Sequence, residues 1–298
     1  MVEIPEELAR AQLTYNGEAG RAFIEELPAR AARFLEQWGL RRSGPGMHGV
    51  TALVLPVVRA DGSPAALKMQ LLDEESAGEP AALRRWDGDG SVRLLEHDEP
   101  TGTLLLERLD ETRHLSRLAA ADPRRAVGVI AELLARLTAV RAPDGMRALG
   151  DIAARMLADA PDAVRELADP RERRLLADCA AALAEVAGEP GDRLLHWDLH
   201  FDNVLGARRE PWLAIDPKPL AGDPGFDLLP AIDNHFVAGD VLWRFDLMTE
   251  VLGLDRERAG AWTLGRVLQN ALWDIEDGER ALREEQVLVA EELLGLRA

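Results

Sequence analysis

The chain has 298 residues, of which 47% are hydrophobic and 30% charged, and it carries a formal net charge of −18 at pH 7. This composition excludes a disordered chain, and the length predicts a folded protein of one large domain or two lobes. The negative charge argues against a nucleic-acid partner and favours cationic ligands. No apolar run approaches the roughly 18 residues of a membrane span, no secretion signal opens the chain, and Cys179 is the one cysteine. We therefore expect a cytoplasmic protein without disulfides.

The first third of the chain predicts one helix followed by a set of strands. Apolar residues recur at helical spacing over 23–38, and a glycine-rich break follows at 43–49. Beyond the break, apolar and β-branched segments separated by turn residues are typical of antiparallel strands. The expected elements are a hairpin over 51–58 and 65–71, a short helix over 79–86, and two strands over 92–96 and 103–108.

The rest of the chain is predicted to be mainly helical. Asp122-Pro123 and Asp169-Pro170 are helix-start signals, because the carboxylate can cap the first turn and proline is tolerated there. Apolar residues then recur at helical spacing after each signal. We therefore predict an α+β chain with a small N-terminal lobe built on an antiparallel sheet (1–108) and a larger, mainly helical C-terminal lobe (109–298).

One short stretch has the spacing of the protein-kinase catalytic loop. It contains His196, Asp198 and Asn203. In this pattern Asp198 accepts a hydrogen bond from an acceptor hydroxyl, Asn203 offers a side-chain oxygen to Mg²⁺, and His196 braces the loop. An alternative is that His196, Asp198 and His200 form a metal site, because alternate residues of a strand share one face.

A second carboxylate is expected at the same metal. Asp216 ends the apolar segment 212–215, and residues 206–211 can turn a hairpin that brings Asp216 back towards Asn203. Mg²⁺ prefers hard oxygen ligands, so one Asp, one Asn and phosphate oxygens suit it. The order of loop, hairpin and strand-ending Asp216 favours this interpretation over the alternative metal site.

The same stretch carries a family resemblance. HWDLHFDNVL (196–205) and REPWLAIDPKPLAGDPGFDLLP (209–230) resemble the aminoglycoside 6-phosphotransferase and hydroxyurea phosphotransferase family, which includes streptomycin 6-kinases. The resemblance covers most of the chain and is looser in the N-terminal lobe. Within it, Asp198 takes the catalytic position and Asn203 and Asp216 take the metal positions.

The resemblance implies both a fold and an activity. The fold is protein-kinase-like and bilobal. The activity is ATP- and Mg²⁺-dependent transfer of the γ-phosphoryl group to a hydroxyl of a small, cationic acceptor. An aminoglycoside such as streptomycin is the first expectation, and antibiotic resistance is the role that it implies.

A lysine is expected to bind the nucleotide phosphates. The chain contains two lysines, and Lys68 lies on the second predicted strand, where a kinase-like lobe places this cation. Glu79, at the start of the predicted helix, is the first choice for its carboxylate partner. Glu75, in an acidic cluster just upstream, is the alternative.

Backbone groups are expected to complete the nucleotide site. Gly46, in the glycine-rich break, would bring backbone N–H groups to the phosphates. Glu107 and Leu109 lie in the predicted connection between the lobes, where backbone N–H and C=O groups would hydrogen-bond the adenine.

Carboxylates and a tryptophan beyond the motif are the candidate acceptor-binding residues. A cationic, hydroxyl-rich ligand favours carboxylates and aromatic faces, and the candidates are Asp227, Asp233, Trp273 and Asp274. The alternative is that these helices simply bury tryptophan and expose carboxylates. Asp223 is interpreted as a structural cap of the turn that follows it.

Two other functions stay open from the sequence: a metabolic kinase for an amino sugar or cyclitol, and a catalytically silent ATP-binding regulator. A protein-serine kinase is disfavoured, because Pro217-Lys218 rather than Phe-Gly follows Asp216, and Asp223-Pro224, seven residues on, leaves no room for an activation segment. We expect a monomer or weak homodimer that binds a small molecule, and neither nucleic acid nor a membrane.

Overall fold

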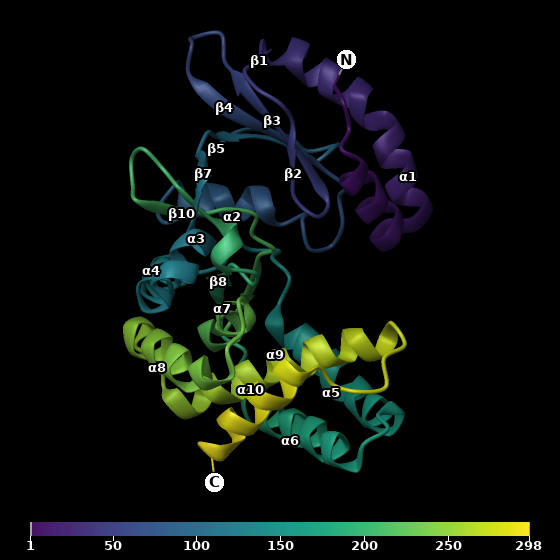
Figure 1. Ribbon diagram of the computed structural model, residues 1–298, viewed down its shortest axis with the longest axis vertical. Coiled ribbons are helices and arrows are strands. Elements are labelled where there is room, and N and C mark those ends of the chain that lie inside the picture. The colour runs from purple at the N-terminus through teal and green to yellow at the C-terminus, as the bar shows by residue number, and fades with distance from the viewer. Residues whose placement is uncertain (1, 298) are drawn as a thin grey trace. The chain divides into compact units, whose positions relative to one another are not determined.

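The computed structural model describes residues 2–297. The chain divides into two compact units, one ending at Asp110 and the other beginning at Glu111. The first is built around a sheet, and the second is made mainly of helices (Figure 1). Among the described residues, no helix is both long and apolar enough to span a membrane.

An antiparallel sheet forms the centre of the first unit. Its strands lie in the order β1-β3-β4-β6-β5, with β2 paired to β3. The strands are β1 (Arg41–Arg42), β2 (Met47–His48), β3 (Ala52–Val58), β4 (Pro64–Gln70), β5 (Leu94–Asp98) and β6 (Thr103–Glu107). Two helices, α1 (Glu6–Gln37) and α2 (Glu79–Trp86), accompany the sheet.

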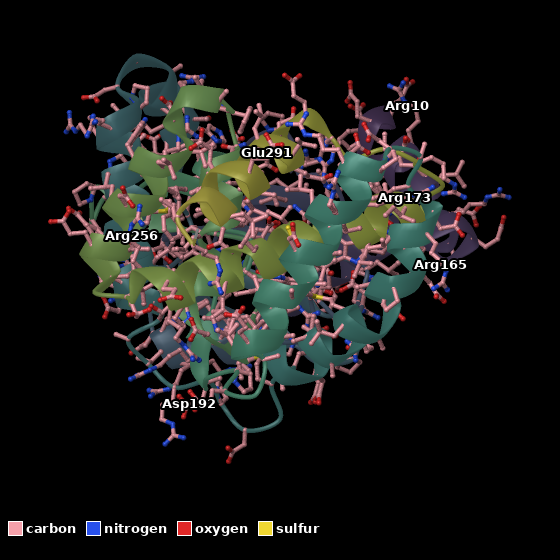
Figure 2. The ribbon with its side chains drawn as sticks, turned by 90° about the horizontal axis from the view of Figure 1, so that it is seen from below. Arg10, Arg165, Arg173, Asp192, Arg256 and Glu291 are labelled. Atoms are coloured by element: carbon pink, nitrogen blue, oxygen red, sulfur yellow. The ribbon has the colours of Figure 1, made fainter. Side chains whose placement is uncertain are left out.

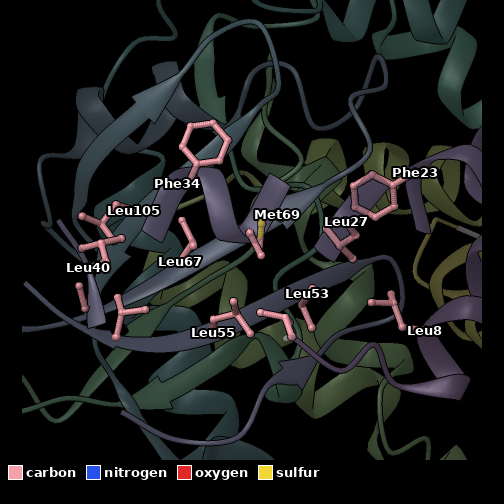
Figure 3. Packing of buried hydrophobic residues seen from close by; sticks show 14 residues of the cluster. Leu8, Phe23, Leu27, Phe34, Leu40, Leu53, Leu55, Leu67, Met69 and Leu105 are labelled. Carbon is pink, nitrogen blue, oxygen red and sulfur yellow. The ribbon is translucent and has the colours of Figure 1, made fainter. Parts of the chain in front are cut away.

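The apolar core of this unit lies between α1 and one face of the sheet (Figure 3). Side chains alternate along a strand, so Leu67 and Met69 of β4 point into the core and Lys68 points to the opposite face. Each buried leucine or phenylalanine contributes roughly 1.5–3 kcal/mol. The core residues from α1 and β3 include Leu8, Phe23, Leu27, Phe34, Leu53 and Leu55.

The second unit combines short strands with long helices. Its strands form two small antiparallel sheets, β10-β9-β7 and β11-β8. The strands are β7 (Asp110–His114), β8 (Arg193–Leu195), β9 (Val204–Gly206), β10 (Trp212–Ala214) and β11 (Leu220–Gly222). The helices are α3 (Leu115–Ala121), α4 (Pro123–Leu137), α5 (Leu149–Glu166), α6 (Pro170–Val186), α7 (Leu229–Asp233), α8 (Val241–Leu252), α9 (Arg256–Glu276) and α10 (Glu284–Gly295).

Helix α9 is the central helix of this unit, and it is buried on every side from Ala259 to Gln269. Gly265 permits close packing there, because a Cβ atom at this position would lie 2.8 Å from Cδ1 of Leu183 on α6. Polar side chains lie at the margin instead: Arg165, Asp192 and Arg256 project outwards in Figure 2. Burial around α9 makes it a rigid support for the side chains that it carries.

The structure confirms the predicted fold class, with an antiparallel sheet in the N-terminal region and a mainly helical remainder. Both strands of the predicted hairpin match β3 and β4 to within one residue. The opening helix begins at Glu6 rather than at residue 23, because a helical segment that the apolar spacing did not predict precedes the predicted one. The two segments join at a kink at Gly17, which has a φ of 51°. Asp122 and Asp169 cap α4 and α6 as predicted.

Candidate active site

The loop between β8 and β9 carries His196, Asp198 and Asn203. Its start is fixed by the buried carboxylate of Asp227. The backbone N–H of His196 donates to Oδ2 of Asp227 at 2.8 Å, and that of Trp197 donates to Oδ1 at 2.5 Å. One carboxylate therefore satisfies two buried N–H groups and holds the backbone on which Asp198 is mounted.

His196 makes hydrogen bonds within the loop, in keeping with the bracing role that the sequence pattern predicted for it. Its Nε2 lies 3.1 Å from the carbonyl oxygen of Ile215, which can only accept, so Nε2 carries the proton. Nδ1 then accepts from the backbone N–H of Asp198 at 3.4 Å. Burial lowers the pKa of His196 to about 4, which agrees with a neutral ring.

Two non-glycine residues of this region have left-handed backbone conformations. Trp197 has a φ of 66° and Asp216 has a φ of 57°. Such conformations are costly for residues with side chains and persist where the surroundings impose them. Both lie next to, or at, a predicted site residue, which supports a functional reason for the strain.

The hairpin of β9 and β10 brings Asn203 and Asp216 together. Asn203 directly precedes β9, and its carbonyl accepts from the backbone N–H of Ile215 at 2.9 Å. The side-chain Nδ2 of Asn203 donates to the carbonyl oxygen of Asp198 at 2.9 Å, which leaves its Oδ1 as the atom for a cation. No group of three or more His, Cys, Asp or Glu side chains suited to a metal occurs within residues 2–297. The alternative site of His196, Asp198 and His200 is therefore not formed.

Asp198 lines a cavity of about 310 Å³ in the second unit. Its Oδ2 lies 3.3 Å from Nζ of Lys218, and its Oδ1 lies 4.0 Å from Nε2 of His200. The other residues around the cavity come from α7, the segment after it and α9. They are Leu229, Pro230, Asp233, Asn234, His235, Arg266 and Asn270.

The structure separates the four predicted acceptor-binding residues. Asp233 lines the cavity, and burial raises its pKa. Trp273 does not line it but packs edge-on against Trp197, with ring centroids 6.0 Å apart. Asp274 lies outside the lining, because its Oδ2 accepts from Nε of Arg283 at 2.9 Å and from Nε2 of Gln286 at 2.7 Å.

Asp227 requires a correction. The sequence placed it at the acceptor, whereas the structure buries it fully beneath the catalytic loop. Burial raises its pKa to about 7, opposed by the two backbone N–H groups that it accepts and by Arg266. Asp223 has the structural place predicted for it: it accepts from the N–H of Gly225 at 2.9 Å and pairs with Nε of Arg258 at 2.8 Å.

Sequence reasoning missed Arg266. This residue lies on α9, is almost fully buried, and its guanidinium stacks 4.7 Å from the Trp197 ring and 5.4 Å from the Trp273 ring. The available signal was an arginine inside the apolar run Leu264-Gly265-Arg266-Val267-Leu268. A buried charge among apolar residues has a structural or functional partner in most proteins.

The wall of the cavity after α7 is fixed by one arginine. Arg244 of α8 is buried, and its guanidinium donates to main-chain carbonyl groups at 2.9–3.2 Å. Its NH2 group also pairs with Oδ2 of Asp240 at 3.1 Å. The carbonyl groups belong to Ala231, Ile232, Asn234 and His235.

In the first unit, Lys68 forms an ion pair with Glu79. Nζ lies 2.8 Å from both carboxylate oxygens, and the two side chains are 6% and 1% exposed. Nε2 of Gln70 adds a hydrogen bond to Glu79 at 2.7 Å. Of the two partners that the sequence left open, the structure pairs Lys68 with Glu79. The backbone N–H of Glu75 donates to Oδ1 of Asp73.

The remaining predicted nucleotide residues also lie in this unit. Gly46 directly precedes β2, where an added Cβ atom would lie 3.2 Å from Cδ2 of Leu55. Glu107 ends β6, and its N–H donates to the carbonyl of Arg93 at 2.9 Å. That N–H is therefore engaged within the sheet. Leu109 is buried.

Comparison with known proteins assigns the family. Residues 37–278 match the family described as aminoglycoside/hydroxyurea antibiotic resistance kinase. The chain belongs to this family. It is 71% identical over 295 residues to the hydroxyurea phosphotransferase of Kitasatospora aureofaciens, covering 99% of this chain and 87% of the relative. It is 55% identical over 303 residues to the streptomycin 6-kinase of Streptomyces glaucescens, covering 99% and 98%.

Solved structures confirm the kinase-like fold of this family member. A choline/ethanolamine kinase family protein from Mesorhizobium loti has a TM-score of 0.60 at 18% identity, covering 92% of this chain and 94% of that protein. Aminoglycoside phosphotransferase APH(4)-Ia, in a ternary complex with AMP-PNP and hygromycin B, has a TM-score of 0.61 at 14% identity, covering 90% and 98%. The predicted family and the predicted phosphotransferase class are confirmed.

Proposed function

We propose that this kinase transfers the γ-phosphoryl group of ATP to a hydroxyl of a small, cationic acceptor, with an aminoglycoside of the streptomycin type as the first candidate. The observation that carries the proposal is the loop 196–203, which the Asp227 carboxylate holds at its start. Asp198 of this loop lines the cavity, and Asn203 lies next to the strand end that carries Asp216. The streptomycin 6-kinase relative supports the acceptor, as does the net charge of −18.

In the proposed reaction, Asp198 orients the acceptor. Its carboxylate accepts a hydrogen bond from the acceptor hydroxyl, whose oxygen attacks the γ-phosphorus. The new O–P bond forms while the bond between the γ-phosphorus and the β,γ-bridging oxygen breaks, and ADP leaves. The hydroxyl proton passes to Asp198 and then to solvent. Positioning and electrostatic stabilisation supply most of the rate in transfers of this kind.

Asn203 and Asp216 suit Mg²⁺. Both offer hard oxygen atoms, and the donation from Nδ2 of Asn203 to Asp198 fixes which of its atoms is the ligand. When bound, Mg²⁺ would neutralise charge on the phosphate oxygens. Asp216 follows the strand β10 in a left-handed backbone conformation, with a φ of 57°.

The first unit would supply the nucleotide phosphates with a cation. Lys68 is held by both oxygens of Glu79, so its ammonium position is fixed before any ligand arrives. Gly46, the carbonyl of Glu107 and Leu109 are the further nucleotide candidates. We assign residues 1–108 to the nucleotide-binding lobe and residues 109–298 to the lobe that carries catalysis and acceptor binding.

A second acceptor has a specific observation in its favour. The relative with 71% identity is named for hydroxyurea, a small acceptor that offers an N-hydroxyl. A cavity of about 310 Å³ accommodates it with room to spare. We infer a small-molecule acceptor in either case, acted on in the cytoplasm by a monomer or weak homodimer, with no nucleic acid involved.

The test is ATP consumption with Mg²⁺ against streptomycin, hydroxyurea, amino sugars and cyclitols, with Asp198→Ala as the control. Turnover of streptomycin that vanishes in Asp198→Ala supports the proposal. Turnover of hydroxyurea alone selects the second acceptor. Turnover only of an amino sugar or cyclitol would make the protein a metabolic kinase, and ATP binding without turnover of any acceptor would make it a silent regulator.

A further inference from the structure

Lys218 is the second of the two lysines in a chain that otherwise uses arginine for its cationic side chains. It lies two residues beyond Asp216, between Pro217 and Pro219, and just before β11. The other lysine, Lys68, already has a place in the proposed nucleotide site. Lysine at these two positions indicates that each needs a compact ammonium group rather than a planar guanidinium.

The backbone of Lys218 is fixed on both sides. Its N–H donates to the carbonyl of His196 at 3.1 Å, and its own carbonyl accepts from Arg147 at 3.2 Å. The flanking prolines restrict φ at 217 and 219. The side chain of Lys218 therefore starts from a defined point next to the catalytic loop.

The ammonium group of Lys218 contacts one oxygen of Asp198. Nζ lies 3.3 Å from Oδ2, and the two side chains are 40% and 25% exposed. The other oxygen, Oδ1, lies 4.0 Å from Nε2 of His200, which lines the cavity together with Asp198. The two carboxylate oxygens thus have different surroundings: Oδ2 faces the Lys218 ammonium, and Oδ1 faces the His200 ring.

We propose that Lys218 is the positioning residue for Asp198, holding Oδ2 so that Oδ1 receives the hydrogen bond of the acceptor hydroxyl. This inference rests on the proposed role of Asp198. In this arrangement the ammonium holds Oδ2, and Oδ1, on the side of His200, is the oxygen for the acceptor. Lys218 thus takes no part in bond making, and the proton still passes from the hydroxyl to Asp198.

Lysine suits this position better than arginine, because its ammonium is a compact cation. A guanidinium presents a planar fork that binds both oxygens of a carboxylate at once. Arginine at this position would occupy Oδ1 as well as Oδ2 and compete with the acceptor. We therefore expect Lys218→Arg to lose activity although it keeps the positive charge.

The experiment measures steady-state kinetics of Lys218→Ala and Lys218→Arg with the best acceptor from the substrate panel. Both variants should lose about 10- to 100-fold in kcat, the range expected for a misplaced reacting group. The KM for ATP should stay within about twofold in both variants. The KM for the acceptor should rise in Lys218→Arg, because the guanidinium competes for Oδ1. The matched control is Arg208→Ala, which removes an exposed cation from the β9–β10 turn of the same unit.

A second readout separates positioning from structural support. Propylammonium replaces the atoms that Lys218→Ala removes and should restore part of kcat, whereas tetramethylammonium, which has no N–H, should not. Full kcat in either variant would overturn the inference. So would a loss in Lys218→Ala that appears as weaker ATP binding in a direct titration, or that propylammonium does not restore.

Failure of the inference is distinguishable from failure of the proposed function. If Asp198→Ala stays active, the proposed role of Asp198 is wrong and the inference falls with it. If Asp198→Ala is inactive and Lys218→Ala keeps full kcat, the proposed function stands and Lys218 alone loses its assignment.

Discussion

The two lysine–carboxylate pairs of this protein differ in almost every physical respect. Lys68 and Glu79 are buried, and the ammonium contacts both carboxylate oxygens, one of which also accepts from Gln70. Lys218 and Asp198 are partly exposed, and the ammonium lies 3.3 Å from Oδ2. In the first pair both carboxylate oxygens bind the ammonium, whereas in the second we propose that Oδ1 serves the acceptor.

This contrast extends to the neighbours of each pair. The groups that support the catalytic loop, His196 and Asp227, are fully buried and have strongly shifted pKa values. The groups proposed to react lie at the cavity. Substitutions should therefore divide into two classes: those at the cavity change turnover with little effect on folding, and those beneath it change folding.

The largest expected effect is on turnover. Asp198→Asn keeps the size of the side chain but removes the carboxylate that we propose receives the proton, so kcat should fall by about 10²- to 10⁴-fold. The melting temperature should change little. Asp202→Asn, an exposed carboxylate four residues further along the chain, is the control and should keep activity. Equal kcat in the two variants would mean that turnover does not need the Asp198 carboxylate, and the difference drawn between the two pairs would be wrong.

The largest expected effect on folding comes from the buried pair. Glu79→Gln leaves the Lys68 ammonium without its carboxylate in a buried site, so the free energy of unfolding should fall by about 3–5 kcal/mol. Denaturant titration measures it, with the exposed Glu74→Gln as control. A loss as small as that of the control would mean that this pair is no more structural than the one at the cavity.

His196 gives a pH-dependent test. Its folded pKa of about 4 lies below its ordinary value of 6.5, so the unfolded chain binds the proton first as pH falls. The stability that neutral His196 contributes is present above pH 6.5 and is lost between pH 6.5 and 4, by up to about 3 kcal/mol. The unfolding free energy of the natural protein minus that of His196→Gln should shrink over this window.

Asp227 should show the opposite slope. Its folded pKa of about 7 lies above its ordinary 3.8, so its contribution is greatest below pH 3.8 and is lost as pH rises towards 7. The unfolding free energy of the natural protein minus that of Asp227→Asn should therefore shrink as pH rises from 3.8 to 7. Two differences with the same slope would contradict the burial assigned to one of these groups.

The smallest expected effect sharpens the contrast. Lys218→Ala should lower the free energy of unfolding by less than about 1 kcal/mol, because partly exposed ion pairs contribute little to stability. Thermal or denaturant unfolding measures it. A loss comparable with that of Glu79→Gln would place Lys218 among the structural groups.

The sequence predicted the parts of the site that depend on local spacing. His196, Asp198 and Asn203 lie on one loop, and a short hairpin returns Asp216, so chain geometry alone brings them together. Lys68 and Glu79 were also foreseeable, because a strand position and a helix start are local features. The length of α1 was not, because the segment before the kink at Gly17 buries only Leu8 and Gln12 and so shows no apolar repeat.

Long-range contacts were beyond the pattern. Whether Asp227 faces the acceptor or the underside of a loop depends on a contact across about thirty residues of chain, and no periodicity encodes it. The same holds for Asp274, which Arg283 and Gln286 hold from the next helix. Arg266 was missed because a helical pattern counts charged residues as surface, and tertiary burial overrode that rule.

Arg244 has a consequence for how new acceptors are acquired. It binds the wall of the cavity through main-chain oxygens alone, from Ala231 to His235. The side chain of Asn234 adds a second support, since its Oδ1 accepts from the backbone N–H of Phe201 at 3.2 Å. Position 233 is therefore the place where the cavity wall can change its side chain while Arg244 keeps the main chain in position, so we expect substitutions there to alter which acceptors fit the cavity.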